Sequence, residues 1–152
     1  MFKFGKSSLD NLNGVEPLLM ATAFRALELS DIDFGVSEGL RDEETQREYV
    51  EKGLSRTMNS KHLTGRAIDV FAYIRGKARW EIEPYFIIAD AFHQAAQENA
   101  VSIRWGGAWH LHNFSTWDTG AKEAYLSYLD YTRTWNKTPF IDAPHFELTN
   151  LD

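Results

Sequence analysis

Four stretches of the chain carry signals of a helix, either an apolar stripe at helical spacing or residues that favour a helix start and stop. The first carries a stripe of leucines and alanines, with Pro17 suited to its first turn. The second opens with acidic residues, which favour a helix start, and ends before Gly53. These patterns predict helices over residues 16–29, 42–52, 83–99 and 121–133.

Other stretches alternate between apolar and polar residues, or are short and apolar, as strands are. They predict strands over residues 34–37, 66–73, 101–105 and 144–148. The alternation places Asp69 on a strand, whereas His62 follows the polar loop of residues 53–61 and lies where the chain enters that strand. We expect one α+β domain over residues 1–152, with a small antiparallel sheet flanked by helices.

The amino-acid composition excludes several classes of functional site. The formal net charge is −6 and the pI about 5.3, which argues against nucleic-acid binding, since that depends on Lys and Arg contacts to phosphates. The chain has no cysteine, which excludes disulfides, thiolate metal ligands and cysteine nucleophiles. Any metal ion must therefore be held by His, Asp or Glu side chains.

The segment Met1–Val15 lacks the apolar core of a signal peptide, and no window approaches the roughly 20 apolar residues of a membrane span. We therefore expect a protein made in the cytoplasm without membrane insertion. If it acts outside that compartment, another factor must release it.

Two segments combine a histidine with a carboxylate. In "SKHLTGRAID", His62 precedes Asp69 by seven residues, and Gly65 allows a tight turn between them. In "DAPHFEL", His145 follows Asp142 by three residues and precedes Glu147 by two. Such spacings also arise by chance, so polar surface residues near a turn remain an alternative.

A catalytic zinc site usually takes three nitrogen or oxygen ligands and leaves one position for water. His62, Asp69 and His145 would form such a shell, with Asp142 as the base that accepts a proton from water. His110 and His112 would share a face on a strand and are rival ligands, but they lack the acidic partner of His145. His93 lies within a predicted helix and is interpreted as structural or surface-exposed.

The same segments resemble a known family. "SKHLTGRAID" fits the S-x-H-x-x-G-x-A-x-D signature of the zinc peptidases that include VanY-type D-alanyl-D-alanine carboxypeptidases, and "DAPHFEL" fits their second signature. "FKFGKSSLDNL", "RALELSDIDFGVSEGLRDEETQ" and "RWGGAW" are more similar to one branch, the phage endolysins that are L-alanyl-D-glutamate peptidases. The likeness runs from the first residues to the last predicted strand.

This resemblance implies one Zn²⁺ per chain, bound by His62, Asp69 and His145, with Asp142 as general base. Glu147 is the rival base, but the family signature implies a position after the ligand and outside the reacting pocket. The resemblance also implies that Arg41 stabilises the developing oxyanion. Pairing of Arg41 with Asp42, Glu44 or another acid remains the alternative.

Substrate contacts are expected from Gln46 and Ser60. The aromatic run that includes Trp109 is interpreted mainly as core, with Trp109 as the member expected at the substrate cleft. Compared with the compact family pattern, the interval from Trp109 to Asp142 is long, which affects the expected fit of the substrate.

The implied function is hydrolysis of the L-Ala–D-Glu bond in bacterial peptidoglycan. Such an endolysin acts as a monomer on the cell wall after a holin opens the membrane. The alternatives are a D-alanyl-D-alanine carboxypeptidase or dipeptidase with the same zinc shell, and a non-catalytic module that binds the wall.

Overall fold

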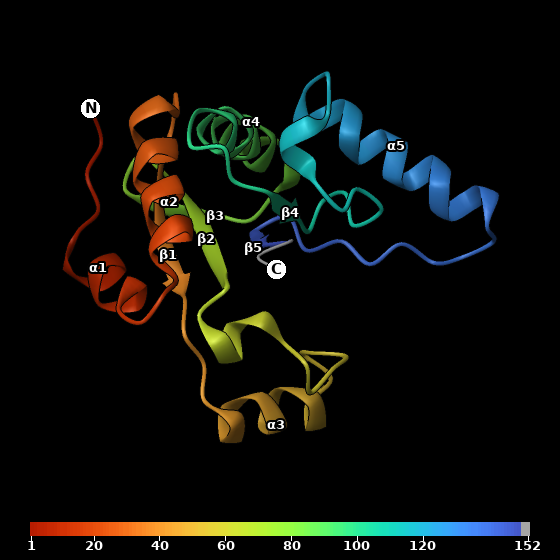
Figure 1. Cartoon of the computed structure of the whole chain (residues 1–152), viewed down its shortest axis with the longest axis horizontal. Coiled ribbons are helices and arrows are strands. Elements are labelled where there is room, and N and C mark those ends of the chain that lie inside the picture. The colour runs from red at the N-terminus through yellow and green to blue at the C-terminus, as the bar shows by residue number, and fades with distance from the viewer. Residues whose placement is uncertain (150–152) are drawn as a thin grey trace.

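An antiparallel sheet forms the centre of the protein, in a computed structural model that describes residues 1–149 (Figure 1). The elements follow in the order α1 (Lys6–Leu12), α2 (Pro17–Leu29), β1 (Asp33–Glu38), α3 (Glu43–Glu51), η1 (Lys61–Thr64), β2 (Ala67–Ile74), β3 (Lys77–Arg79), α4 (Ile82–Glu98), β4 (Ile103–Trp105), η2 (Phe114–Thr116), α5 (Ala121–Thr134) and β5 (His145–Leu148), where η denotes a short 3₁₀ helix.

The strand order is β1-β2-β5-β4, and β3 pairs with β2. All of these pairings are antiparallel. The register places His145 opposite Asp69, and Asp69 opposite Glu38. Because directly opposed residues of an antiparallel pair share a face, the pairing brings these polar side chains together.

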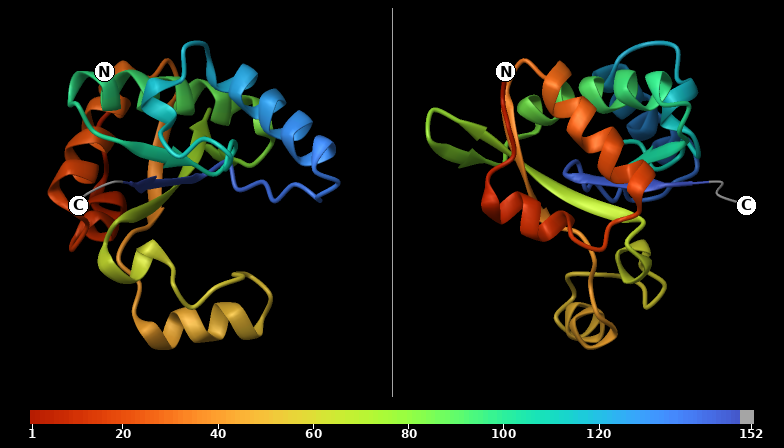
Figure 2. Two further views of the ribbon diagram at one scale, coloured as in Figure 1. Left: turned by 45° about the vertical axis from the view of Figure 1, so that its right-hand side comes forward. Right: turned by 60° about the vertical axis from the view of Figure 1, so that its left-hand side comes forward.

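Helices α2 and α4 cover one face of the sheet, whereas α3 lies on the other side (Figures 1 and 2). The covered face is apolar: Phe92 of α4 stacks on Phe146 of β5 with ring centroids 3.9 Å apart, beside the fully buried Trp105. Alternation along β5 then turns His145 and Glu147 toward the opposite face. The core and the polar site thus occupy opposite faces of the same strand.

The predicted α+β class with a small antiparallel sheet is confirmed, and the four predicted helices correspond to α2, α3, α4 and α5. Asp42 lies just before α3 and accepts a hydrogen bond from the Thr45 backbone, so it caps the helix. Two predicted strands are shorter than expected, since β4 begins at Ile103 and β5 at His145.

Four elements were not predicted: helix α1, strand β3 and the short 3₁₀ helices η1 and η2. Helix α1 is polar and has no side-chain cap; tertiary contacts hold it, including the hydrogen bond from the Val36 backbone to Ser8 Oγ. Strand β3 is fully exposed and shows no alternation. It returns through a tight turn in which Arg75 and Gly76 both have positive φ. None of the helices within residues 1–149 has the length and apolar character needed to cross a membrane.

Candidate active site

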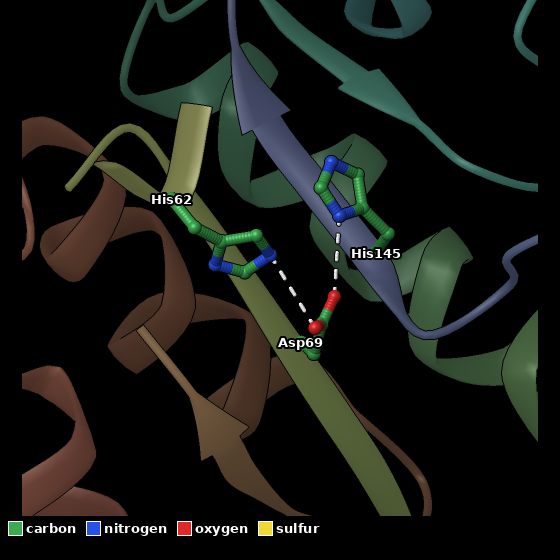
Figure 3. A group of neighbouring side chains, drawn as sticks. All are labelled: His62, Asp69 and His145. Carbon is green, nitrogen blue, oxygen red and sulfur yellow. Dashed lines mark hydrogen bonds and ion pairs between the residues drawn. The ribbon is translucent and has the colours of Figure 1, made fainter. Parts of the chain in front are cut away.

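Three side chains from separate parts of the chain meet on the polar face of the sheet: His62 from η1, Asp69 from β2 and His145 from β5 (Figure 3). Oδ2 of Asp69 lies 3.3 Å from Nε2 of His62, and Oδ1 lies 3.1 Å from Nδ1 of His145. One ligand atom from each residue lies within 4.8 Å of the other two. The cluster could therefore hold a metal ion.

Local structure orients His62. Ser60 caps η1 by accepting a hydrogen bond from the His62 backbone, and Gly65 ends it in the left-handed conformation with φ +70°. The imidazole Nδ1 lies 2.8 Å from the carbonyl oxygen of Gly39. Since a carbonyl only accepts, Nδ1 carries a proton, and Nε2 is the nitrogen that faces Asp69 and would bind a metal ion.

The other imidazole is held between carboxylates. Nε2 of His145 lies 2.8 Å from Oε1 of Glu147, while Nδ1 faces Asp69. Lys61 in turn lies 3.1 Å from Oε2 of Glu147 and donates to the Leu148 carbonyl. Glu147 thus holds the proton of His145 on Nε2 and directs Nδ1 toward the cluster.

The charges of the cluster also suit a cation. Burial acts to raise the pKa of Asp69, but hydrogen bonds from His145 and His62 outweigh it and hold the pKa below its ordinary value. Burial acts to lower the pKa of His145, yet hydrogen bonds to Asp69 and Glu147 raise it to about 10. A protonated imidazole therefore sits among carboxylates, at the place where a metal ion would supply the positive charge.

The spacing of these atoms is compatible with zinc. Ligand atoms about 2.0–2.2 Å from a tetrahedral ion lie roughly 3.4 Å apart. The distances from His62 Nε2 to Asp69 Oδ2, 3.3 Å, and from His145 Nδ1 to Asp69 Oδ1, 3.1 Å, are near that value, and one donor atom from each of the three residues lies within 4.8 Å of the other two. Two neutral imidazole nitrogens and one carboxylate oxygen, with no thiolate, are a donor set that zinc accepts.

Asp142 lies beside the cluster, with Oδ2 3.9 Å from Nδ1 of His145. Its backbone pairs with Gly106, where the Asp142 amide donates to the Gly106 carbonyl at 2.9 Å. A Cβ at Gly106 would lie 2.0 Å from the Asp142 carbonyl oxygen, so this close approach requires glycine. Burial, together with the negative charge of Asp69, raises the pKa of Asp142.

Arg41 is buried at the edge of the cluster. It forms an ion pair with Glu38, and its Nη2 lies 3.8 Å from Oδ2 of Asp69. The predicted acidic partner therefore exists, but it is Glu38 rather than Asp42 or Glu44. Burial lowers the pKa of Arg41, and the negative charge of Asp69 acts against this shift.

Gln46 lies behind Arg41 and does not line the cavity. Its side chain is fully buried; Oε1 accepts from Arg41 at 2.5 Å, and Nε2 donates to Ser55 and to the Thr57 carbonyl. The structure thus corrects the expectation that Gln46 touches substrate, because its polar atoms are already engaged within the protein. Ser60, by contrast, lines the cavity as well as capping η1.

A cavity of about 610 Å³ opens over the cluster. One wall comes from α3 and the loop after it, and the other from Trp109, Phe140 and Asp142. Trp109 lies 5.2 Å from the His145 ring between centroids, at the cavity wall where the sequence analysis placed it. The volume is within the usual range for sites that bind small molecules or short peptide segments.

The position expected for Glu147, outside the reacting pocket, is wrong. Glu147 lines the cavity together with the cluster, because it shares with His145 one face of β5. Four further residues line the cavity without having been predicted from the sequence: Glu38, Lys61, Arg104 and Phe140. Alternation along β4 and β5 is the one signal that could have placed Arg104 on that face.

The remaining histidines lie elsewhere. His110 Nε2 lies 3.0 Å from Ser127 Oγ, and its ring packs beside Tyr128 and Tyr131. His112 is exposed, and His93 lies 2.7 Å from the Trp117 carbonyl. Within residues 1–149, none of the three belongs to the cluster that could hold a metal.

Comparisons with known proteins agree with this geometry. The model of the phage L-alanyl-D-glutamate peptidase family matches residues 1–126. The chain is 40% identical over 113 residues to the L-alanyl-D-glutamate peptidase of Escherichia phage T5, covering 72% of this chain and 82% of that protein.

A solved structure extends the likeness to almost the whole chain. The L-Ala D-Glu endopeptidase ChiX of Serratia marcescens superposes with a TM-score of 0.72 at 36% sequence identity, covering 97% of this chain and 90% of ChiX. Sequence motifs, fold and family model thus agree, and the chain belongs to the phage L-alanyl-D-glutamate peptidase family.

Proposed function

We propose that this protein is a zinc peptidase that hydrolyses the L-Ala–D-Glu bond in the peptide stems of bacterial peptidoglycan, and so acts as an endolysin. One observation carries the proposal: His62, Asp69 and His145 converge beside Asp142 in a cavity, in a chain of this family. The choice of the L-Ala–D-Glu bond as the one cleaved rests on the names of its relatives in phage T5 and Serratia.

Nε2 of His62, a carboxylate oxygen of Asp69 and Nδ1 of His145 would hold one Zn²⁺. When bound, zinc supplies a Lewis acid that polarises the scissile carbonyl and lowers the pKa of a water molecule. The protein fixes the donor atoms: the Gly39 carbonyl orients His62, and Glu147 orients His145. Hydrogen-bond partners on the far nitrogen of each ring keep that ring in the tautomer that binds metal.

Asp142 is the proposed general base. Its raised pKa suits a group that accepts a proton from the attacking water and then passes it to the leaving amine. Glu147 is less suited to this role because it lies at the Nε2 edge of His145, whereas Asp69 and Asp142 lie near Nδ1. Lys61 also engages Glu147.

Arg41 is the proposed electrophilic partner of the scissile carbonyl. Its guanidinium lines the cavity, and Glu38 and Gln46 hold it in place. A buried cation fixed in advance stabilises negative charge that develops on the carbonyl oxygen during attack. Ser60 and Trp109, which line the same cavity, are proposed to contact the substrate.

The proposed substrate also determines where the protein would act. We infer that the single domain of residues 1–152 acts as a monomer on the cell wall, after a holin gives it access from the cytoplasm.

Digestion of purified peptidoglycan by the zinc-loaded protein, followed by mass spectrometry, tests the proposal. We expect new amino-terminal D-Glu on released peptides, with L-Ala left on the glycan. Release of D-Ala would instead indicate a D,D-carboxypeptidase. Binding to the wall without any cleavage product would indicate a non-catalytic module.

A further inference from the structure

Two arginines and two aromatic rings form a row that lines the cavity and joins its two walls. Cζ of Arg104 lies 5.4 Å from the Trp109 ring centroid, Trp109 stacks on Phe140 at 6.2 Å, and Cζ of Arg56 lies 4.5 Å from the Phe140 centroid. All four residues line the cavity. The row begins beside the cluster of His62, Asp69 and His145, since Trp109 also packs on His145.

Arg104 is the member of this row that is built into the sheet. It lies on β4 directly opposite Glu147 of β5, so its side chain emerges on the face that carries His145. Nε donates to the Trp109 carbonyl at 2.8 Å, and Nη2 donates to the same oxygen. These bonds fix the guanidinium plane and leave Nη1 without a hydrogen-bond partner among residues 1–149.

The charges around the cavity single out Arg104. Arg41 is paired with Glu38, and Lys61 with Glu147. Among residues 1–149, no carboxylate lies within ion-pair distance of Arg104 or Arg56. Arg56 lies on the exposed loop after α3, whereas Arg104 is half-buried and held by the protein. An oriented guanidinium without a counter-ion, in a cavity, is suited to a carboxylate ligand.

The proposed substrate carries a carboxylate beside its scissile bond, and Arg104 packs on Trp109, which lies against His145 of the cluster. The L-Ala side of the scissile bond is uncharged, whereas the D-glutamate residue carries a carboxylate on the carbon attached to the scissile nitrogen. We propose that Arg104 binds this α-carboxylate and so makes the enzyme selective for glutamate on the leaving side of the bond. This inference rests on the proposed function and concerns a specificity residue, not a further catalytic step.

The test uses two stem peptides that differ in one group. One carries D-glutamate with a free α-carboxylate, and the other carries the α-carboxamide, which is nearly the same shape but neutral. We expect the wild type to favour the carboxylate by roughly 10- to 100-fold in kcat/KM, the usual range for a hydrogen bond between charged groups. Arg104→Gln should lose that preference while cleaving the carboxamide almost as well as the wild type.

Matched variants separate this role from a structural one. Arg133→Gln changes an arginine on the exposed surface of α5 and should keep the wild-type preference. Arg104→Lys retains the charge and should keep a reduced preference. It serves as the second variant if Arg104→Gln proves unstable in thermal melts. Arg56→Gln tests the other arginine of the row and should change the preference less than Arg104→Gln.

The outcomes are distinct. Equal losses on both peptides in Arg104→Gln would show that Arg104 only supports Trp109, and would overturn the inference. So would equal cleavage of both peptides by the wild type, with the proposed function intact. A zinc-loaded wild type that cleaves neither peptide, nor peptidoglycan, would instead overturn the proposed function and the inference with it.

Discussion

His145 and Glu147 lie two residues apart on β5, and Nε2 of the imidazole lies 2.8 Å from Oε1 of the carboxylate. Because a deprotonated carboxylate can only accept, Nε2 keeps its proton toward Glu147, and the proton that the ring would give up on binding a metal ion is the one on Nδ1, toward Asp69. Hydrogen bonds to His145 and Lys61 outweigh burial and lower the pKa of Glu147, which keeps it ionised. The pair therefore fixes which nitrogen of His145 faces Asp69.

Replacing Glu147 with glutamine should weaken zinc binding more than it slows turnover. The amide oxygen still accepts from Nε2 but carries no charge, and changes to the hydrogen-bond partner of a metal-binding histidine typically reduce metal affinity by roughly 10- to 100-fold. Competition with a chelator of known affinity measures the effect. Glu43→Gln, on the exposed surface of α3, is the control and should bind zinc as the wild type does.

Asp142→Asn should remove the proposed base while keeping the shape of the side chain. Proton transfer by a positioned group contributes about 10²–10⁴-fold, so we expect turnover to fall by that factor with zinc content and melting temperature nearly unchanged. Glu147→Gln, assayed with saturating zinc, should lose much less. The reverse order at equal zinc content would show that the base is assigned to the wrong carboxylate.

Removal of zinc should abolish lysis, and its addition should restore it. Each of the variants His62→Ala, Asp69→Ala and His145→Ala should lose the metal, because a site with only three protein ligands binds the ion weakly once one ligand is removed. His110→Ala and His112→Ala should retain it, since neither belongs to the cluster. Metal analysis of the purified variants measures both sets. Full activity in a verified metal-free preparation would contradict the mechanism.

His110 should make the fold sensitive to acid. Burial is the main cause that lowers its pKa, and the charge of Arg104 adds to it. Because the folded pKa lies below the unfolded value of about 6.5, the unfolded chain takes up the proton first as the pH falls. The stability contribution is therefore complete above about pH 6.5 and is lost as the pH falls through the folded pKa.

Thermal melts at pH 7.5 and 5.5 measure this effect. The melting temperature of His110→Gln should fall less between the two conditions than that of the wild type. His112→Gln, which changes an exposed histidine, should follow the wild type. Equal falls in all three proteins would show that His110 does not contribute to acid sensitivity.

The sequence predicted features that depend on local periodicity or on a signature. The apolar stripe of α2 follows from residue spacing alone, because a helix that covers a sheet must bury one face. Alternation placed Asp69 on a strand, and the two signatures singled out His62 and His145. Helix α1 and strand β3 were missed because neither carries an apolar pattern; contacts with β1 and β2 define them.

Only the tertiary structure decided how the site side chains face one another. Glu147 was expected outside the pocket but lies against His145. Gln46 lies behind Arg41. Arg104 lines the cavity because β4 pairs with β5, which places it opposite Glu147. The physical reason is that residue spacing determines the face of an element on which a side chain emerges. Its neighbours across the sheet depend on pairing between strands that are far apart in the chain, and hydrogen-bond partners follow from that pairing.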